Sequence, residues 1–497
     1  MLGVQISGKS YLILIFTVFM NISPKILSFL SPKLSFRRNV LTASLSLSSC
    51  SSASASSSSC SSSSLNDYNY AWDYYNNVLG GPKYIMAPMV DQSELAFRLL
   101  VKNNGCDICF SQMHHAFNFN RDPKYREDSI DWEVDSKHYD IINQDIDLSF
   151  MSNSNNNDYE KLDQKLIVQF AGNDPNILVE AASHVQHQKN VAGIDLNLGC
   201  PQKIAKRGNY GAYLLQNQQS LILDILSNMV NKLDVPVSAK IRILGNDDDT
   251  IKFCKQLQNT GISMLTVHGR TVDNSKLFTG PANWDVIKDI KQELDIPIVA
   301  NGGISCLEDA NKCLEYTGVE AIMSSEALLE NPKLFNYDGD ASFRKNYITT
   351  QLQTVSEYLR LVEAFRSPSP FYQVVRSHLF RLLFRFVDAP KNKDLRQILA
   401  KGRLPEMYQV INTIYERMQT VDMDVECAIE AGLLSKTSWY MRHRCESNSE
   451  RRMANKRKYI YPPTQRVGNI VLNDEEVKNK VIALKDRLKK KRQNNIM

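Results

Sequence analysis

The chain has 497 residues, which is long enough for two or more domains with full hydrophobic cores. Its 43% hydrophobic and 23% charged residues are typical of a soluble globular protein, and its net charge of +5 is too small to indicate a class of partner. Ten cysteines are scattered without a repeating framework, which argues against a disulfide scaffold. Cys106 and Cys109 form a lone C-x-x-C pair; without a second pair, we expect both to lie in or beside a buried strand and to bind no metal.

Residues 1–66 differ in composition from the rest of the chain. They contain no Asp or Glu, and they include a serine tract, Ser44–Ser64, that cannot bury enough apolar surface to fold. The apolar run Tyr11–Met20 is shorter than the roughly 20 residues that a membrane-spanning helix needs. We therefore predict a disordered or targeting extension. A secretory signal and an organellar presequence both stay open, and otherwise we expect the protein in the cytoplasm or nucleus.

From Tyr84 onward, short β-rich runs alternate with stretches of helical length. The eight predicted strands are Tyr84–Val90, Asp107–Met113, Lys165–Ala171, Gly193–Gly199, Pro236–Ile243, Met264–Gly269, Ile296–Gly302 and Glu320–Ser324. The predicted helices are Ser93–Lys102, Pro175–His187 with Asp174 as its N-cap, Ser220–Leu233, Thr250–Thr260, Trp284–Leu294 and Leu307–Tyr316. This alternation predicts parallel strands with right-handed crossovers. Because no G-x-G-x-x-G follows the first strand, we favour an α/β fold with a closed (β/α)8 barrel, a TIM barrel, over residues 82–335 rather than a doubly wound sheet.

Outside the barrel pattern the chain changes character. The polar stretch 114–164, with the cluster Asn153–Asn157, is predicted to be a loop insertion. Helical spacing after residue 335 predicts a smaller all-α domain over 340–435, with helices at Phe343–Ala364, Pro370–Phe386 and Pro405–Gln419. Residues 436–497 form a basic tail that is either solvated or in contact with RNA. The same two interpretations apply to four basic residues on or near one face of the middle helix: Arg376, His378, Arg381 and Arg385.

Polar or special residues recur at the predicted C-terminal ends of the strands, where chemistry gathers in such barrels. They are Met89 with Val90, Gln169, Asn197 with Cys200, Lys240 with Arg242, His268 with Arg270, Asn301-Gly302-Gly303, and Ser324-Ser325-Glu326. The glycines before the next helix offer backbone N–H groups to a phosphate. Met89 can cover a planar ring, and Lys240 can offset negative charge that develops on it. Together these positions predict a flavin mononucleotide (FMN) site.

The stretch after the fourth predicted strand combines a thiol with positive charge. Cys200 lies in a sharp turn, and three basic residues follow it: Lys203, Lys206 and Arg207. This pattern indicates a reactive thiol beside an anion-binding loop.

Several motifs in this order resemble the dihydrouridine synthases, flavin enzymes that reduce uridine in tRNA. Within that family, the chain resembles the eukaryotic group that acts on tRNA positions 16 and 17. The motifs lie between about residues 82 and 419, and D-L-N-L-G-C-P-Q is the most specific of them. They are A-P-M-V-D (Ala87–Asp91), L-I-V-Q-F (Leu166–Phe170), D-L-N-L-G-C-P-Q (Asp195–Gln202), R-G-N-Y-G-A-Y (Arg207–Tyr213), L-T-V-H-G-R-T (Leu265–Thr271), N-G-G-I (Asn301–Ile304) and N-P-K-L-F (Asn331–Phe335).

The resemblance implies roles for particular residues. FMN would be held by Pro88, Met89, Val90, Gln169, Lys240, His268, Asn301, Gly302, Gly303, Ser325 and Glu326. Cys200 would be the proton donor, and the substrate would contact Asn197, Lys203, Lys206, Arg207 and Arg270. NADPH or NADH would be the reductant, and tRNA the partner of the helical domain. We expect a monomer with no metal and no stable membrane association of its folded part.

The chain also departs from the family pattern. The segment Ser111–Ala116 lacks the expected Thr-Pro-Met and Arg, Ser325 replaces an alanine, and no glycine follows Glu326. These departures weaken the expectation for a particular uridine and leave the flavin and cysteine positions intact. Two alternatives to the resemblance also stay open. One is an FMN barrel that acts on a small pyrimidine or dihydroorotate, and the other is a non-catalytic RNA-binding barrel.

Overall fold

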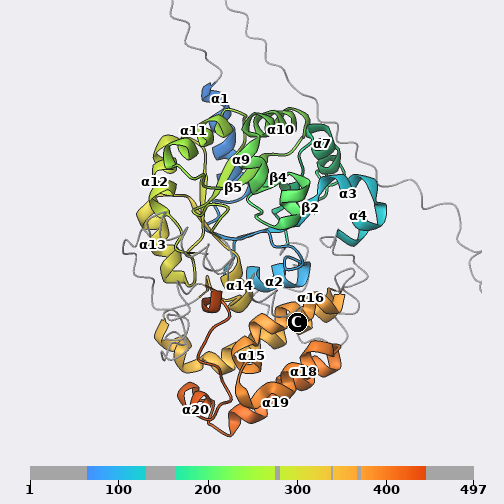
Figure 1. Ribbon diagram of the computed structural model, residues 1–497, viewed down its shortest axis with the longest axis vertical. Helices are drawn as coiled ribbons and strands as arrows, with labels where there is room; N and C mark the ends of the chain where they lie inside the picture. Colours follow the sequence, from blue (N-terminus) through green and yellow to red (C-terminus); the bar gives the residue numbers. More distant parts are fainter. Residues whose placement is uncertain (1–63, 130–162, 275–279, 337–339, 366–370, 444–497) are drawn as a thin grey trace, which may run out of the picture. The chain divides into compact units, whose positions relative to one another are not determined.

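The computed structural model describes residues 64–129, 163–274, 280–336, 340–365 and 371–443 (Figure 1). Most of the predicted N-terminal extension, most of the polar stretch 114–164, and the basic tail from residue 444 lie outside these residues. Among the described residues, no helix is both long enough and apolar enough to cross a membrane.

Eight parallel strands close into a barrel in chain order, which confirms the predicted fold. The strands are β1 Tyr84–Met86, β2 Ile108–His115, β3 Leu166–Ala171, β4 Val191–Leu198, β5 Val237–Arg242, β6 Met264–His268, β7 Ile298–Asn301 and β8 Ala321–Ser324. The barrel closes where β8 pairs with β1, with Ile322 opposite Tyr84. The first strand is shorter than predicted. Pro88 has no N–H for a strand ladder, and the chain turns at once, with Asp91 at φ +55° and the Ser93 hydroxyl accepting from the Met89 N–H at 2.9 Å.

Helices follow the strands and surround the barrel, as Figure 1 shows for α7, α10, α11, α12 and α13. Their bounds are α2 Leu95–Asn103, α3 Ala116–Arg121, α4 Pro123–Ser129, α7 Pro175–Ser183, α8 Lys203–Gly208, α9 Ala212–Asn217, α10 Gln219–Lys232, α11 Asp247–Gln258, α12 Trp284–Glu293, α13 Leu307–Thr317 and α14 Glu326–Glu330. The Asp174 side chain accepts from the N–H groups of Asn176 and Ile177, which confirms its predicted role as N-cap of α7.

The period-2 alternation of the strands separates two environments. On β4, Ile194, Leu196 and Leu198 belong to the apolar core between strands and helices, whereas Asp195 and Asn197 alternate with them. Inside the barrel, an apolar cluster is formed by Ile85, Ile108, Phe110, Ile167, Met264, Val299, Ala321 and Met323. Polar side chains of β3, β4 and β5 also lie in the interior, so one part of the barrel interior is polar and another part is an apolar core.

The folded region begins before the predicted barrel boundary at residue 82. Helix α1 (Ser64–Asp73) and the π-helical turn η1 (Tyr74–Val78) precede β1. Tyr74, Tyr75 and Leu79 are part of the same cluster as the apolar barrel interior. Gly193 near the start of β4 makes room for this segment, because a Cβ atom there would collide with the Tyr74 hydroxyl. Composition alone could not show that this segment packs against the barrel interior.

Beyond the barrel, the described chain is helical. The elements are α15 Asp340–Ala364, α16 Phe371–Leu382, α17 Phe384–Val387, η4 Pro390–Asn392, α18 Lys393–Lys401, α19 Leu404–Gln419, α20 Val425–Glu430 and η5 Met441–His443. The predicted middle helix is interrupted at Leu383, so it forms α16 and α17.

Four basic residues of α16 and α17 were predicted to be solvated or in contact with RNA, and this prediction is wrong for two of them. His378 has 0% exposure and lies 2.9 Å from the Glu94 carboxylate, which also accepts from the Tyr358 hydroxyl at 2.7 Å. Arg385 is 1% exposed; its guanidinium lies 4.7 Å from the Tyr347 ring centroid. Burial alone would raise the pKa of Glu94, but the charge and hydrogen bond of His378 and the hydrogen bond from Tyr358 lower it. These side chains join the helical region to the barrel and are closed to both solvent and RNA.

Candidate active site

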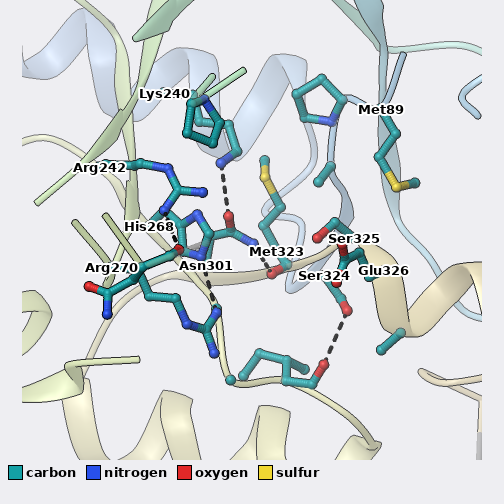
Figure 2. A pocket seen from close by; sticks show the side chains of 18 of the residues that line it. Met89, Lys240, Arg242, His268, Arg270, Asn301, Met323, Ser324, Ser325 and Glu326 are labelled. Carbon is teal, nitrogen blue, oxygen red and sulfur yellow. Dashed lines mark hydrogen bonds between the residues drawn. The ribbon is translucent and has the colours of Figure 1, made fainter. Parts of the chain in front are cut away.

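A cavity of about 620 Å³ lies at the C-terminal ends of the barrel strands, within the usual range of roughly 300–1,000 Å³ for small-molecule sites. Ten of the residues predicted to bind ligand line it: Pro88, Met89, Lys240, His268, Arg270, Asn301, Gly302, Gly303, Ser325 and Glu326. Figure 2 shows the basic side chains and Asn301 converging on one part of this pocket, with Met89 on another. The barrel thus brings together residues that are more than 200 positions apart in sequence.

Other predicted residues lie outside the cavity lining. Val90 is 53% exposed, because the chain has already left the strand and turned. Gln169 is fully buried and hydrogen-bonds Asn197, whose side chain holds the turn at Cys200. We therefore expect Gln169 and Asn197 to act beside the cavity, and the side chain of Val90 lies outside its lining.

Lys240 is the central cation of the cavity. Its Nζ donates to the Asn301 Oδ1 at 2.8 Å, and the Asn301 Nδ2 donates to the Met323 carbonyl at 2.8 Å (Figure 2). Burial, together with the charge of Arg242, lowers the pKa of Lys240 to about 7, and the charge of Asp195 opposes the shift. A bound group with negative charge would restore the ammonium form, so this position favours a ligand that carries or develops negative charge.

The loop after β7 provides a cradle for an anionic group. Gly302 and Gly303 have φ +105° and +83°, a conformation that side chains rarely adopt. A Cβ atom on Gly302 would lie 2.8 Å from His268 Cδ2 and 3.1 Å from Arg270 Nη1. His268 Nε2 and Arg270 Nη1 are themselves 3.1 Å apart. This close approach of backbone and basic side chains fits a phosphate, and Arg270, which was predicted to contact the substrate, is one of these side chains.

The thiol of Cys200 lies in a turn that is held from several directions. Asn197 Oδ1 accepts from the N–H groups of Gly199 and Cys200 at 3.1 and 3.0 Å, and Arg242 Nε donates to the Gly199 carbonyl at 2.8 Å. Burial raises the pKa of Cys200 above its usual value, against a backbone hydrogen bond at Gln202 and the charge of Arg242. Desolvation therefore outweighs the nearby cation, which does not bring the pKa of this thiol toward neutrality. A thiol with a raised pKa keeps its proton at physiological pH, which is the form that a proton donor needs.

The three basic residues after Cys200 lie on the short helix α8 and are exposed. They do not line the cavity. Lys206 has a partner of its own, because its Nζ lies 5.6 Å from the centroid of the Tyr213 ring. Lys203 and Arg207 stand on the same surface helix. The structure therefore separates these cations from the predicted cofactor contacts while keeping them next to the thiol turn in the chain.

A segment at the end of the described chain also contributes to the cavity. Trp439 and Tyr440 line it, and their backbone N–H groups donate to the Glu330 carboxylate at 3.0 and 2.9 Å. The guanidinium carbons of Arg381 and Arg442 lie 5.0 and 5.1 Å from the Trp439 ring centroid. The segment belongs to the predicted basic tail from residue 436, and no local pattern in it predicts contact with the barrel.

Some cavity residues could have been predicted and others could not. Arg242 follows Lys240 by two positions on β5, so the period-2 rule places both on the interior face. Pro201 and Gln202 follow Cys200 directly in the chain and line the cavity, whereas Cys200 is not among the lining residues. Asn274 and Met323 had no local signal.

The cysteine pair at β2 has a structural environment. Cys106 and Cys109 are both buried and free, and the Cys106 thiol hydrogen-bonds the carbonyls of Tyr84 and Ile108 at 3.5 and 3.3 Å. Among the described residues, no group of three or more His, Cys, Asp or Glu side chains could hold a metal ion.

Comparisons with known proteins agree with the motifs. Residues 85–419 match the family model described as Dihydrouridine synthase (Dus). A Mus musculus protein named "tRNA-dihydrouridine(16/17) synthase [NAD(P)(+)]-like" is 37% identical over 336 residues, which are 68% of this chain and 62% of that protein. The match therefore spans less than two thirds of that relative. A Saccharomyces cerevisiae protein named "tRNA-dihydrouridine(16/17) synthase [NAD(P)(+)]" is 33% identical over 370 residues, 73% of this chain and 80% of that protein. The solved structure of morphinone reductase is 9% identical with a TM-score of 0.33, covering 51% of this chain and 84% of that one, a similarity too low to indicate a shared activity.

Proposed function

The chain belongs to the dihydrouridine synthase family, and from this premise we propose that it is an FMN-dependent tRNA-dihydrouridine synthase. It reduces the C5–C6 double bond of D-loop uridines, at positions 16 and 17, with NADPH or NADH as the reductant. The observation that supports this most is a cation-lined cavity at the strand ends beside a protonated thiol on an Asn-held turn.

The cavity residues suit FMN in charge and shape. Gly302, Gly303, His268 and Arg270 would hold the phosphate of FMN, and Lys240 would offset negative charge on the cofactor. When bound, FMN supplies the hydride that reduces the uracil ring. The remaining proton must come from a protein group that is still protonated at physiological pH.

Cys200 meets this requirement. Its neutral thiol gives a proton to C5 of the uracil, and the resulting thiolate regains a proton from solvent before the next turnover. Asn197 uses one N–H for Gln169 and its oxygen for the turn, so one N–H is left to hold the uracil. The target base has to leave its stack to reach this position. The exposed cations of α8 follow the Cys200 turn directly in the chain and suit contact with the RNA backbone.

The test uses the purified full-length chain. We expect a flavin absorbance spectrum and NAD(P)H-dependent dihydrouridine at tRNA positions 16 and 17, mapped site by site. Cys200→Ala should retain flavin and lose about 10²-fold or more of the rate, as expected when a general acid is removed. Cys427→Ala, an exposed thiol in α20, is the matched control and should leave the rate unchanged. Reduction of free uridine nucleotides as readily as tRNA would contradict the proposed substrate, and full activity of Cys200→Ala would contradict the role of the thiol.

A further inference from the structure

Behind the cavity, three side chains of neighbouring strands form a buried polar layer inside the barrel. Asp195 on β4 is opposite Gln169 on β3 and Ser238 on β5 in the strand register. Asp195 and Gln169 have 0% exposure, and Ser238 has 2%. The Asp195 carboxylate accepts from Gln169 Nε2 and from the Ser238 hydroxyl, each at 2.7 Å. A buried carboxylate is unfavourable unless such donors satisfy it, so both bonds are needed to keep it there.

This layer connects to the thiol turn through one continuous chain of hydrogen bonds. Gln169 Oε1 accepts from Asn197 Nδ2 at 2.7 Å, and Asn197 Oδ1 accepts from the N–H groups of Gly199 and Cys200. Which group donates and which accepts in this series of hydrogen bonds follows from the groups at its two ends. Backbone N–H groups can only donate, and an ionised carboxylate can only accept. Each amide between them therefore has a single orientation that satisfies both neighbours.

We propose that Asp195 is a positioning residue that anchors Gln169, and through it Asn197, so that the Cys200 thiol is held in place. This inference rests on the proposed role of Cys200 as proton donor. Asp195 itself is not among the residues that line the cavity. Its effect passes along the chain because Gln169 is fully buried and its Nε2 has the carboxylate as its partner.

The contacts of Asp195 with Gln169 and Ser238 are hydrogen bonds and do not depend on its charge alone. The titratable groups that influence Asp195 are Lys240 of β5 and Tyr74 of η1, and neither is hydrogen-bonded to it. The pKa of Asp195 is raised to about 6, because burial outweighs the hydrogen bonds from Gln169 and Ser238 and the charge of Lys240, which lower it. An uncharged side chain that still accepts from Gln169 should therefore serve the same purpose. Asparagine meets this condition, because its Oδ1 accepts from Gln169 and its Nδ2 donates to the Ser238 hydroxyl.

The test measures how fast iodoacetamide alkylates Cys200 in flavin-free full-length protein, resolved by peptide mass spectrometry. The exposed Cys427 of the same molecules is the internal reference. Asp195→Leu removes the acceptor at similar volume, and we expect the Cys200 rate to rise by about threefold or more, because the turn opens and the thiol is less buried. In Asp195→Asn the alkylation rate of Cys200 should rise by less than about threefold. The same holds for Ser238→Ala, which leaves the hydrogen bond between Asp195 and Gln169 in place.

Each outcome decides the proposal. The proposal is overturned when the alkylation rate of Cys200 in Asp195→Leu rises by less than about threefold over that of the unchanged protein. It is also overturned when the rate in Asp195→Asn is as high as the rate in Asp195→Leu. Should Asp195→Leu fail to fold, Gln169→Leu breaks the same chain one link later and is judged by the same threshold. The assay requires neither flavin nor RNA, so its result is independent of whether tRNA proves to be the substrate.

Discussion

The substitution Gly302→Ala tests the proposed phosphate cradle directly. Gly302 has φ +105°, and its backbone lies against two basic side chains that have no room for a further atom. An alanine Cβ would be 2.8 Å from His268 Cδ2 and 3.1 Å from Arg270 Nη1, so both side chains would have to shift by a few tenths of an ångström. The change therefore strains the backbone and displaces the groups that we assign to the phosphate.

The two effects have different magnitudes and different readouts. A positive φ costs an alanine about 1–2 kcal/mol, which lowers the free energy of unfolding. Displacement of His268 and Arg270 weakens FMN binding in addition. We expect the dissociation constant to rise by about tenfold or more, equivalent to about 1.4 kcal/mol of binding free energy.

Gly318→Ala is a matched control, because Gly318 also has a positive φ, +69°, and a Cβ there would meet nothing within 4 Å. Flavin-free protein is titrated with FMN by fluorescence, and thermal midpoints are measured in parallel. Both variants should lose stability, and only Gly302→Ala should lose affinity. Equal affinities for the two variants would refute the reasoning, since they would show that crowding at the cradle does not reach the ligand.

Two further outcomes test the cavity. Because burial lowers the pKa of Lys240 to about 7, its ammonium is present below that pH and is lost as the pH rises through it. FMN affinity should therefore fall above pH 7 by up to about tenfold per pH unit, and Lys240→Met should bind weakly without this dependence; a pH-independent wild type would contradict the role. Trp439→Ala removes a buried ring from the cavity wall, so FMN should dissociate faster by several-fold while the far side of the barrel is unaffected. The control is Trp72, whose indole N–H donates to the Asp295 carbonyl: Trp72→Ala should lower the thermal midpoint without changing FMN dissociation. Equal rates of FMN release in the two variants would refute the role of Trp439.

Much of the barrel could be predicted from local patterns. Strands that alternate with helices leave few topologies, because parallel crossovers are right-handed and short. The period of two then places Lys240 and Arg242 on one face of β5, and the common direction of the strands brings their C-terminal ends to one edge. Asn301 and Gly302 meet Lys240 for the same reason.

The errors occurred where a local pattern met an irregular backbone or a distant partner. Val90 and Met89 are adjacent in sequence, yet only Met89 lines the cavity, because the chain turns after Pro88. His378 has the spacing of an exposed basic face, but Glu94, 284 residues earlier in the chain, holds it in the interior. Trp439 lies far beyond the last strand, and the Glu330 carboxylate accepts from its backbone N–H where it lines the cavity.

The sequence by itself determined which residue types stand at the strand ends, and with them the barrel and the positions of the thiol and the cations. The tertiary structure alone decided their protonation. Cys200 and Lys240 have pKa values that shift in opposite directions through the same cause, burial, which penalises the charged form of each. Burial depends on what the rest of the chain places around a side chain, and no local pattern in the sequence contains that information.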